Sequence, residues 1–145
     1  MQYWDSSALV KLYVPEEDTE FFLRLSSAAG STIHTSLIAS VELVCAVLRA
    51  EVDGRIGSSA ARQLIRQFDR DRESGRVVLR EVGEAVREET VRLGETVFHR
   101  KPPIMIRSLD LIHVATASVC GATHLVAVDK RLRDVASLLK LKVLP

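Results

Sequence analysis

Short apolar runs alternate along this chain with segments in which apolar residues recur at helical spacing. Strands are predicted at residues 1–4, 76–82, 123–128 and 141–144, and the stretch STIHT at 31–35 is a plausible second strand. The helical spacing covers residues 7–14, 21–29, 36–48, 58–74, 83–98, 108–122 and 129–140. Because strands that alternate with helices build parallel sheets through right-handed crossovers, the pattern predicts an α/β fold. We expect a mainly parallel sheet with helices covering both of its faces.

Helix-breaking residues mark the boundaries of several of these elements. Pro15 ends the first predicted helix, and Gly30 closes the second, which opens on the acidic residues 16–20. The chain has 145 residues and contains no repeat or convincing linker. We therefore expect one domain that spans residues 1–145.

Composition and charge describe a soluble globular protein without identifying its partner. Hydrophobic residues make up 47% of the chain and charged residues 27%. The 20 Lys and Arg residues almost balance the 19 Asp and Glu residues, so any affinity for nucleic acid must be local. Cys45 and Cys120 lie in apolar stretches without CxxC spacing. They predict two buried thiols in a reducing cytosol rather than a disulfide or a zinc site.

No segment of the sequence predicts secretion or a membrane span. Residues 1–10 lack the basic and then apolar layout of a signal peptide, so we expect a cytoplasmic protein. Residues 111–128 contain no Asp, Glu, Lys or Arg and are about long enough to cross a bilayer. Two histidines, several hydroxyl groups and the break at Gly121 predict a helix, a turn and a strand there instead.

Four acidic residues stand in apolar surroundings, whereas the other 15 of the 19 acids lie in polar stretches typical of a surface. The four are Asp5, Glu42, Asp110 and Asp129. Asp5 and Asp129 each follow a strand and precede a helix, and Asp110 lies in a first turn, so helix capping is one interpretation of these three. Glu42 lies well inside a helix, where no N–H group needs a cap. Its alternative interpretation is a stem packed on the core with its head in solvent, or a pair with an arginine such as Arg49.

Together, the four acids predict a shared site. Ligands of an open parallel sheet bind outside the carboxyl ends of its strands, where Asp5 and Asp129 meet if their strands are adjacent. Four carboxylates in one pocket repel one another unless a cation neutralises them, and oxygen donors favour Mg²⁺ or Mn²⁺ over Zn²⁺. On this hypothesis Glu42 belongs to a metal site. Its replacement by Gln is then expected to stabilise the metal-free protein by relieving repulsion.

The stretches that carry the four acids resemble, in this order, the acidic motifs of PIN-domain nucleases. They read DSSALVKLYVPEE, SLIASVELVCAVL, RSLDLIHVATA and LVAVDKRL, and the resemblance covers nearly the whole chain. The first stretch and the compact length particularly resemble VapC-type toxins of bacterial toxin–antitoxin pairs. The resemblance implies a three-layer α/β/α sandwich and an Mg²⁺- or Mn²⁺-dependent endoribonuclease that cleaves single-stranded RNA. It also implies a small antitoxin partner and a homodimer.

The resemblance assigns roles to individual residues. It implies that Asp5, Glu42, Asp110 and Asp129 form the catalytic site, with Asp5 and Asp110 as the principal metal ligands. Glu42 and Asp129 would complete the site through ligands or waters. Ser6 matches a small hydroxylic residue that follows the first acid. Many relatives carry Ser or Thr two residues before the fourth acid, whereas this chain has Ala127 there.

The expected chemistry is hydrolysis of a phosphodiester. A divalent ion lowers the pKa of a bound water and neutralises charge in the transition state, so no side-chain nucleophile is needed. The resemblance implies 5′-phosphate and 3′-hydroxyl products. Ser6, Arg107 and Lys130 are candidate RNA contacts, with ordinary surface charge as the alternative for the two cations. His113, one turn after Asp110, either approaches the pocket or is a hydrogen-bonded core residue.

Two other functions remain open on the sequence. A receiver-like signalling domain also has an acidic Mg²⁺ pocket, but it has adjacent acids after its first strand, whereas this chain has Asp5 alone. A catalytically silent PIN-like domain that serves only as a binding module is the second, and the presence of all four acids disfavours it.

Overall fold

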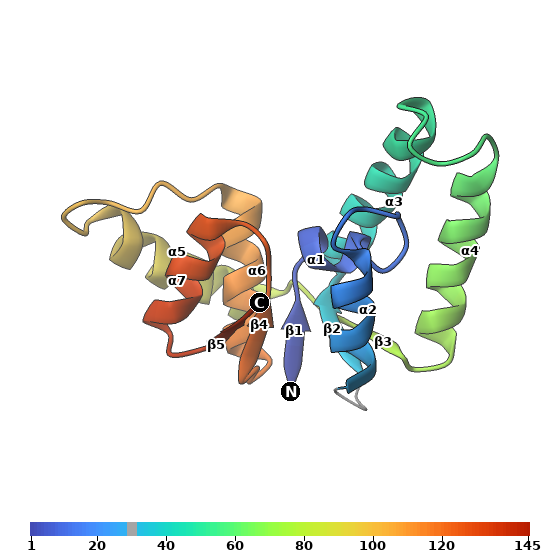
Figure 1. The fold of residues 1–145 in the computed structure, drawn as a ribbon. Helices are drawn as coiled ribbons and strands as arrows, with labels where there is room; N and C mark the ends of the chain where they lie inside the picture. The colour runs from blue at the N-terminus through green and yellow to red at the C-terminus, as the bar shows by residue number, and fades with distance from the viewer. Residues whose placement is uncertain (29–31) are drawn as a thin grey trace.

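The computed structural model describes residues 1–28 and 32–145, which form a parallel sheet with helices on both faces (Figure 1). The strands are β1 (Gln2–Trp4), β2 (Ile33–Ser36), β3 (Val77–Arg80), β4 (His124–Val126) and β5 (Lys142–Leu144). Their order across the sheet is β3-β2-β1-β4-β5, and every pair of neighbours is parallel. The predicted three-layer α/β/α architecture is confirmed.

The helices divide into two layers by sequence. One layer contains α1 (Ser6–Val10), α2 (Thr19–Ala28), α3 (Leu37–Val52) and α4 (Ala60–Glu73). The other contains α5 (Glu84–Phe98), α6 (Ser108–Val119) and α7 (Lys130–Leu138). Each layer packs on the sheet through its own apolar cluster, and Figure 1 shows the two layers on opposite sides of β1.

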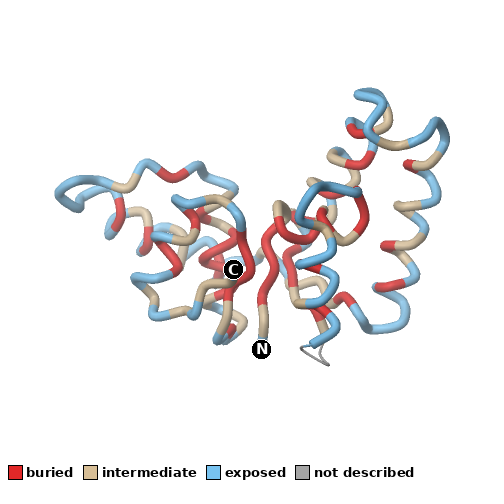
Figure 2. The backbone as a smooth tube through the Cα atoms, viewed as in Figure 1, coloured by how far each residue is buried: buried red, intermediate tan, exposed pale blue. Residues whose placement is uncertain are grey.

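Alternate strand residues supply these two clusters. Tyr3 and Leu125 are buried against α5, α6 and α7, whereas Trp4 and Val126 are buried against the helices of the first half. All four are fully buried, and Figure 2 shows the central strands as a buried strip. Strands covered on both faces bury side chains that point to either side, which explains why consecutive residues of β1 and β4 are apolar.

The direction in which the chain adds strands reverses between β1 and β4. The chain adds β2 and β3 on one side of β1, then crosses the sheet to add β4 and β5 on the other side. In open α/β sheets such a reversal leaves a crevice at the carboxyl ends of the two strands. Asp5 follows β1 and Asp129 comes three residues after β4, so both acids lie at this crevice, as expected from adjacent strands.

The first helix is shorter than the sequence predicts. It ends at Val10 rather than near residue 14, and the chain continues in tight turns, with Leu12 N–H donating to Leu9 and Tyr13 N–H to Val10. The turns direct the largely buried Lys11 onto Glu16 and Asp18, at 2.7 and 2.6 Å. The helix thus ends before Pro15, and local ion pairs of Lys11 lie in the turns that follow it.

Other boundaries differ in smaller ways. The α3 helix begins after Ser36, whose hydroxyl accepts from Ala39 N–H at 3.0 Å, and it runs one turn beyond the predicted end. The predicted helix stop at Gly30 and strand start at residue 31 lie outside the described residues. The prediction of a buried thiol is wrong for Cys45, which is exposed because it lies on the outer face of α3. No helix in residues 1–28 and 32–145 has the length and apolar character to cross a bilayer.

Candidate active site at the carboxyl edge of the sheet

Asp5 is a buried carboxylate held by the start of α1. Its Oδ1 accepts the Ala8 N–H at 3.0 Å, and the Ser7 hydroxyl contacts both carboxylate oxygens at 2.9 Å. The capping interpretation is therefore confirmed, but Asp5 is only 3% exposed. Burial raises the pKa of the Asp5 carboxyl above its usual range, although the Ala8 and Ser7 hydrogen bonds favour the charged form. The residue is thus more than a cap: it keeps a carboxyl group in a place that disfavours its charge.

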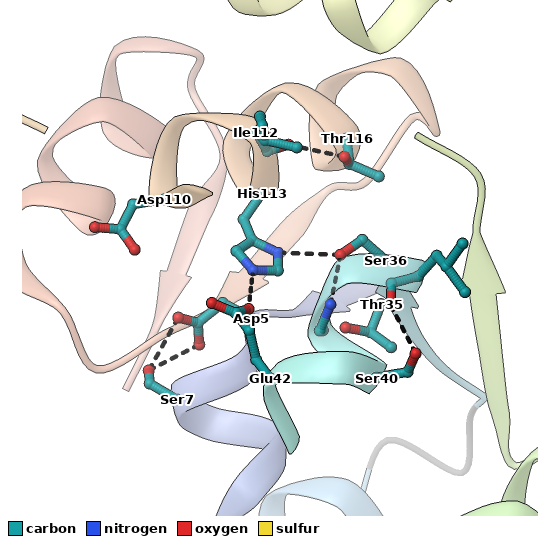
Figure 3. A network of polar contacts seen from close by, with 12 residues as sticks. Asp5, Ser7, Thr35, Ser36, Ser40, Glu42, Asp110, Ile112, His113 and Thr116 are labelled. Carbon is teal, nitrogen blue, oxygen red and sulfur yellow. Dashed lines mark hydrogen bonds and ion pairs between the residues drawn. The ribbon is translucent and has the colours of Figure 1, made fainter. Parts of the chain in front are cut away.

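Glu42 reaches from the middle of α3 to the buried face of α6. Its Oε2 lies 2.8 Å from Nε2 of His113, which is 1% exposed, whereas the Glu42 side chain is 29% exposed (Figure 3). Burial alone would raise the pKa of Glu42, but the hydrogen bond from His113 holds it below its usual range, with help from Ser6 and Arg107. Its protein partner is therefore a buried histidine and not an arginine such as Arg49.

His113 connects Glu42 to the interior of the sheet. Its Nδ1 lies 2.9 Å from the Tyr3 hydroxyl and 3.4 Å from Oγ of Ser36. The contacts thus join β1, the end of β2, α6 and α3. Figure 3 shows the links from His113 to Ser36 and Glu42. Both interpretations of His113 hold, because the ring is a hydrogen-bonded core residue and also contacts a site acid. Its spacing of one helical turn from Asp110 is the sequence feature that pointed to the site.

Asp110 and Asp129 are linked by Arg107. Arg107 Nε donates to Asp110 Oδ2 at 2.9 Å, and its Nη2 lies 3.7 Å from Asp129 Oδ2. Asp129 also caps α7, since its Oδ1 accepts the N–H groups of Arg131 and Leu132 at 2.8 and 3.1 Å. The Arg107 side chain is 72% exposed, so its guanidinium spans the two acids at the surface of the site.

The structure brings the predicted residues to one edge of the sheet, but the side chain of Lys130 is directed along its own helix. Figure 3 shows Asp5, Glu42 and Asp110 arriving from three different elements. Ser6 and Glu42 line the same groove, and Arg107 lies between Asp110 and Asp129. Lys130 instead pairs with Asp134 along its own helix at 2.7 Å.

A groove opens beside Glu42, between α1 and α3. Its volume is about 450 Å³, and its lining includes Ser6, Val10, Glu42, Arg49 and Val128. The guanidinium of Arg49 is two helical turns beyond Glu42 on α3. The site is therefore continuous with an open groove that is partly apolar and is also lined by Lys11 and Glu16.

The donors suit a hard divalent cation, although they are not arranged as a ligand set. Carboxylate oxygens are the donors that Mg²⁺ and Mn²⁺ prefer, and a cation would relieve the unfavourable burial of the Asp5 charge. However, within residues 1–28 and 32–145 no three Asp, Glu, His or Cys side chains are placed to hold an ion. In this conformation Asp110 turns to Arg107 and Glu42 turns to His113. The fit is thus one of chemistry and location, with Asp5 and Asp110 as the residues that would hold the ion.

Comparisons with known proteins agree with this architecture. The sequence pattern that defines the PIN domain matches residues 3–138. A search among curated proteins found no match.

Solved structures similar to this chain show the same fold at low sequence identity. FitAcB from Neisseria gonorrhoeae superposes with a TM-score of 0.70 at 15% identity, covering 100% of this chain and 97% of the other. VapBC2 from Rickettsia felis, bound to a promoter DNA fragment, gives 0.66 at 19% identity, covering 99% and 98%. VapC20 from Mycobacterium tuberculosis, a toxin that cleaves the sarcin-ricin loop, gives 0.67 at 17% identity, covering 92% and 94%.

Proposed function

The chain belongs to the PIN-domain family, and on that premise we propose that it is an Mg²⁺- or Mn²⁺-dependent endoribonuclease that cleaves single-stranded RNA. One observation carries the proposal. Asp5, Glu42, Asp110 and Asp129 come from four separate segments and lie at the edge where strand order reverses, which is where α/β sheets bind ligands. Family membership also removes the receiver-like alternative.

In this proposal the metal ion activates the water, and the protein orients the carboxylates that hold the ion. Asp5 and Asp110 would hold the divalent ion, which would supply a water of lowered pKa and neutralise charge on the reacting phosphate. The Ser7 hydroxyl and the Ala8 N–H fix the Asp5 carboxylate from behind, so its orientation does not depend on the substrate. On this proposal the 3′-oxygen is the leaving group, as the family resemblance implies, so the products carry 5′-phosphate and 3′-hydroxyl ends.

Arg107, Ser6 and Lys130 are the proposed RNA contacts. Arg107 offers a mostly exposed guanidinium between two site acids, where it reduces the repulsion that a phosphate meets on approach. Ser6 lies at the mouth of the groove beside Glu42. Lys130 is 85% exposed and pairs only with the surface carboxylate of Asp134, an interaction that costs little to exchange for a phosphate.

We further propose that the nuclease acts as the toxin of a toxin–antitoxin pair in the cytoplasm. The likeness in fold to FitAcB, VapBC2 and VapC20 supports this role. The proposal includes a small antitoxin protein that covers the acidic edge, and a homodimer of the nuclease.

Cleavage of an end-labelled single-stranded RNA tests the proposal. We expect cleavage with Mg²⁺ or Mn²⁺, none with EDTA, and products that a 5′-phosphate-dependent exonuclease degrades. Ca²⁺ should support cleavage poorly because it does not adopt the near-octahedral geometry of Mg²⁺. Cleavage that persists in EDTA excludes the metal-dependent reaction. RNA binding without cleavage under any of these ions favours the catalytically silent PIN-like module.

A further inference from the structure

A buried chain of polar groups ends on Glu42, and the nuclease chemistry of metal and water does not by itself require it. It runs from the Tyr3 hydroxyl through the two ring nitrogens of His113 to Oε2 of Glu42. Tyr3 is fully buried and His113 is 1% exposed, so neither reaches RNA. Burying two polar side chains in a small core costs free energy unless each finds a partner. This series of hydrogen-bonded groups therefore suggests a function at its exposed end, Glu42.

The position of the ring proton follows from the partners of each nitrogen. Burial raises the pKa of Tyr3, so its hydroxyl keeps its proton and needs an acceptor. Nδ1 of His113 lies 2.9 Å from that hydroxyl and is the acceptor. The Ser36 hydroxyl, whose Oγ lies 3.4 Å from Nδ1, accepts from Ala39 N–H and keeps its own O–H free to donate to Nδ1. A neutral ring that accepts at Nδ1 carries its proton on Nε2, and this N–H donates to Glu42.

This donation fixes a side chain that would otherwise be mobile. Glu42 has three rotatable bonds and sits in the middle of α3, where no backbone N–H is free to hold its carboxylate. The contact with the buried ring therefore anchors one carboxylate oxygen, Oε2. The anchor is rigid because Tyr3, Ser36 and the apolar core hold the ring on its other side.

We propose that His113 is a positioning residue for the nuclease, whose Nε2–H orients the Glu42 carboxylate and whose tautomer is set by the Tyr3 hydroxyl. The inference rests on the proposed function, since it assigns a role within the same site. His113 acts through Glu42 and does not touch the substrate.

Two amide substitutions separate this role from simple packing. The amide nitrogen of Gln reaches the place of Nε2, whereas that of Asn reaches only the place of Nδ1. His113→Asn should lower kcat on the order of 10- to 100-fold, the size of one hydrogen bond to a charged group, with KM for RNA unchanged. His113→Gln should stay within a few-fold of the wild type. Equal losses in both variants, or a loss confined to KM, would overturn the proposal.

The tautomer gives a readout that is independent of cleavage. In ¹⁵N NMR spectra of the wild-type protein without metal or RNA, His113 should show a protonated Nε2 and an unprotonated Nδ1. Tyr3→Phe should shift the Nδ1 resonance and lower kcat. The matched control is Tyr13→Phe, which removes another buried hydroxyl, hydrogen-bonded to Asp71 at 2.7 Å in the other apolar cluster. It should change neither quantity.

The NMR outcomes also separate this proposal from the proposed function. A proton on Nδ1 in the wild type, or an unchanged His113 spectrum in Tyr3→Phe, sinks the positioning role whatever the activity. The expected tautomer in a protein that never cleaves RNA contradicts the nuclease function instead, and with it the catalytic consequence of the contact.

Discussion

Asp5 both stabilises and destabilises the folded protein, the first as a helix cap and the second as a buried charge. As the cap of α1 its oxygen accepts the Ala8 N–H and stabilises the helix start. As a 3% exposed charge it destabilises the metal-free protein, because burial raises its pKa in the folded state. The folded protein therefore holds this proton more tightly than the unfolded chain. It follows that stability is lost as pH rises above the ordinary pKa of 3.8.

Asp5→Asn should accordingly stabilise the metal-free protein at pH 7, by on the order of 1 kcal/mol, since Asn caps a helix as well as Asp and carries no charge. Urea unfolding in EDTA measures the difference, which should shrink as pH approaches 4. Asp129→Asn is the matched control: it changes another strand-end cap whose side chain is 33% exposed, and it should leave stability nearly unchanged. A destabilised Asp5→Asn protein at neutral pH would contradict the buried-charge explanation.

The charge of Glu42 affects stability in the opposite direction to that of Asp5. The contact with His113 lowers its pKa, so the ionised carboxylate adds stability above its ordinary pKa of 4.5, and this stability is lost as pH falls below it. Glu42→Gln should cost about 0.5–1 kcal/mol at pH 7 and little at pH 4, as urea unfolding would show. The exposed Glu95→Gln on α5 should cost nothing measurable.

The sequence alone predicts the reverse result for Glu42→Gln, because four converging acids imply repulsion. His113 lies 71 residues away, and only the packing of α6 on the sheet brings it within 2.8 Å. Stabilisation by Glu42→Gln in EDTA would show that repulsion dominates after all.

Among the elements, the α3–α4 pair contains a cap that sequence patterns do not predict. Ser59 precedes α4 but has a left-handed backbone (φ 67°), and its side chain makes no capping bond. The carboxylate of Glu51, near the end of α3, accepts the N–H groups of Ser59 and Ala61 instead. A side chain from one helix thus caps the next and fixes the turn between them.

Glu51→Ala should therefore destabilise the protein by about 1 kcal/mol, the usual cost of losing a helix cap. Chemical unfolding measures the change, and Glu95→Ala provides a control at an exposed helical position where we expect less than about 0.5 kcal/mol. Equal effects of the two substitutions would mean that the Glu51 contacts contribute nothing.

At the scale of the whole molecule, the alternation of strands and helices was enough to predict the parallel sheet, the two helical layers and the edge at which Asp5 and Asp129 lie. The order of the strands was not in the pattern, because pairing depends on which apolar faces meet across the sheet. The end of α1 was also missed, because the apolar spacing does not show that Lys11 pairs with Glu16 and Asp18 outside the helix. The exposed Cys45 shows that an apolar stretch does not say which helix face is covered.

The candidate site was likewise only partly predictable from the sequence. Its four acids were identified from local sequence, because each is a charge in an apolar stretch. Their partners were not, since Arg107 reaches across to Asp129 and His113 reaches back to Tyr3 only in the folded chain. Local composition therefore predicts which groups are present at the edge, and packing decides how each is oriented.

The most direct test of the central claim compares RNA cleavage by the wild type, Asp110→Asn and Asp69→Asn in the same Mn²⁺ buffer. Asp69 is an acid on α4 that pairs with Arg72 at 3.2 Å, outside the groups gathered at the carboxyl edge. Asp110→Asn should lower kcat by at least about 100-fold while the protein stays folded, because it removes a carboxylate at the reacting centre. Asp69→Asn should cleave as the wild type does. An Asp110→Asn protein that cleaves RNA at the rate of Asp69→Asn would contradict the account of this edge as a metal-dependent nuclease site.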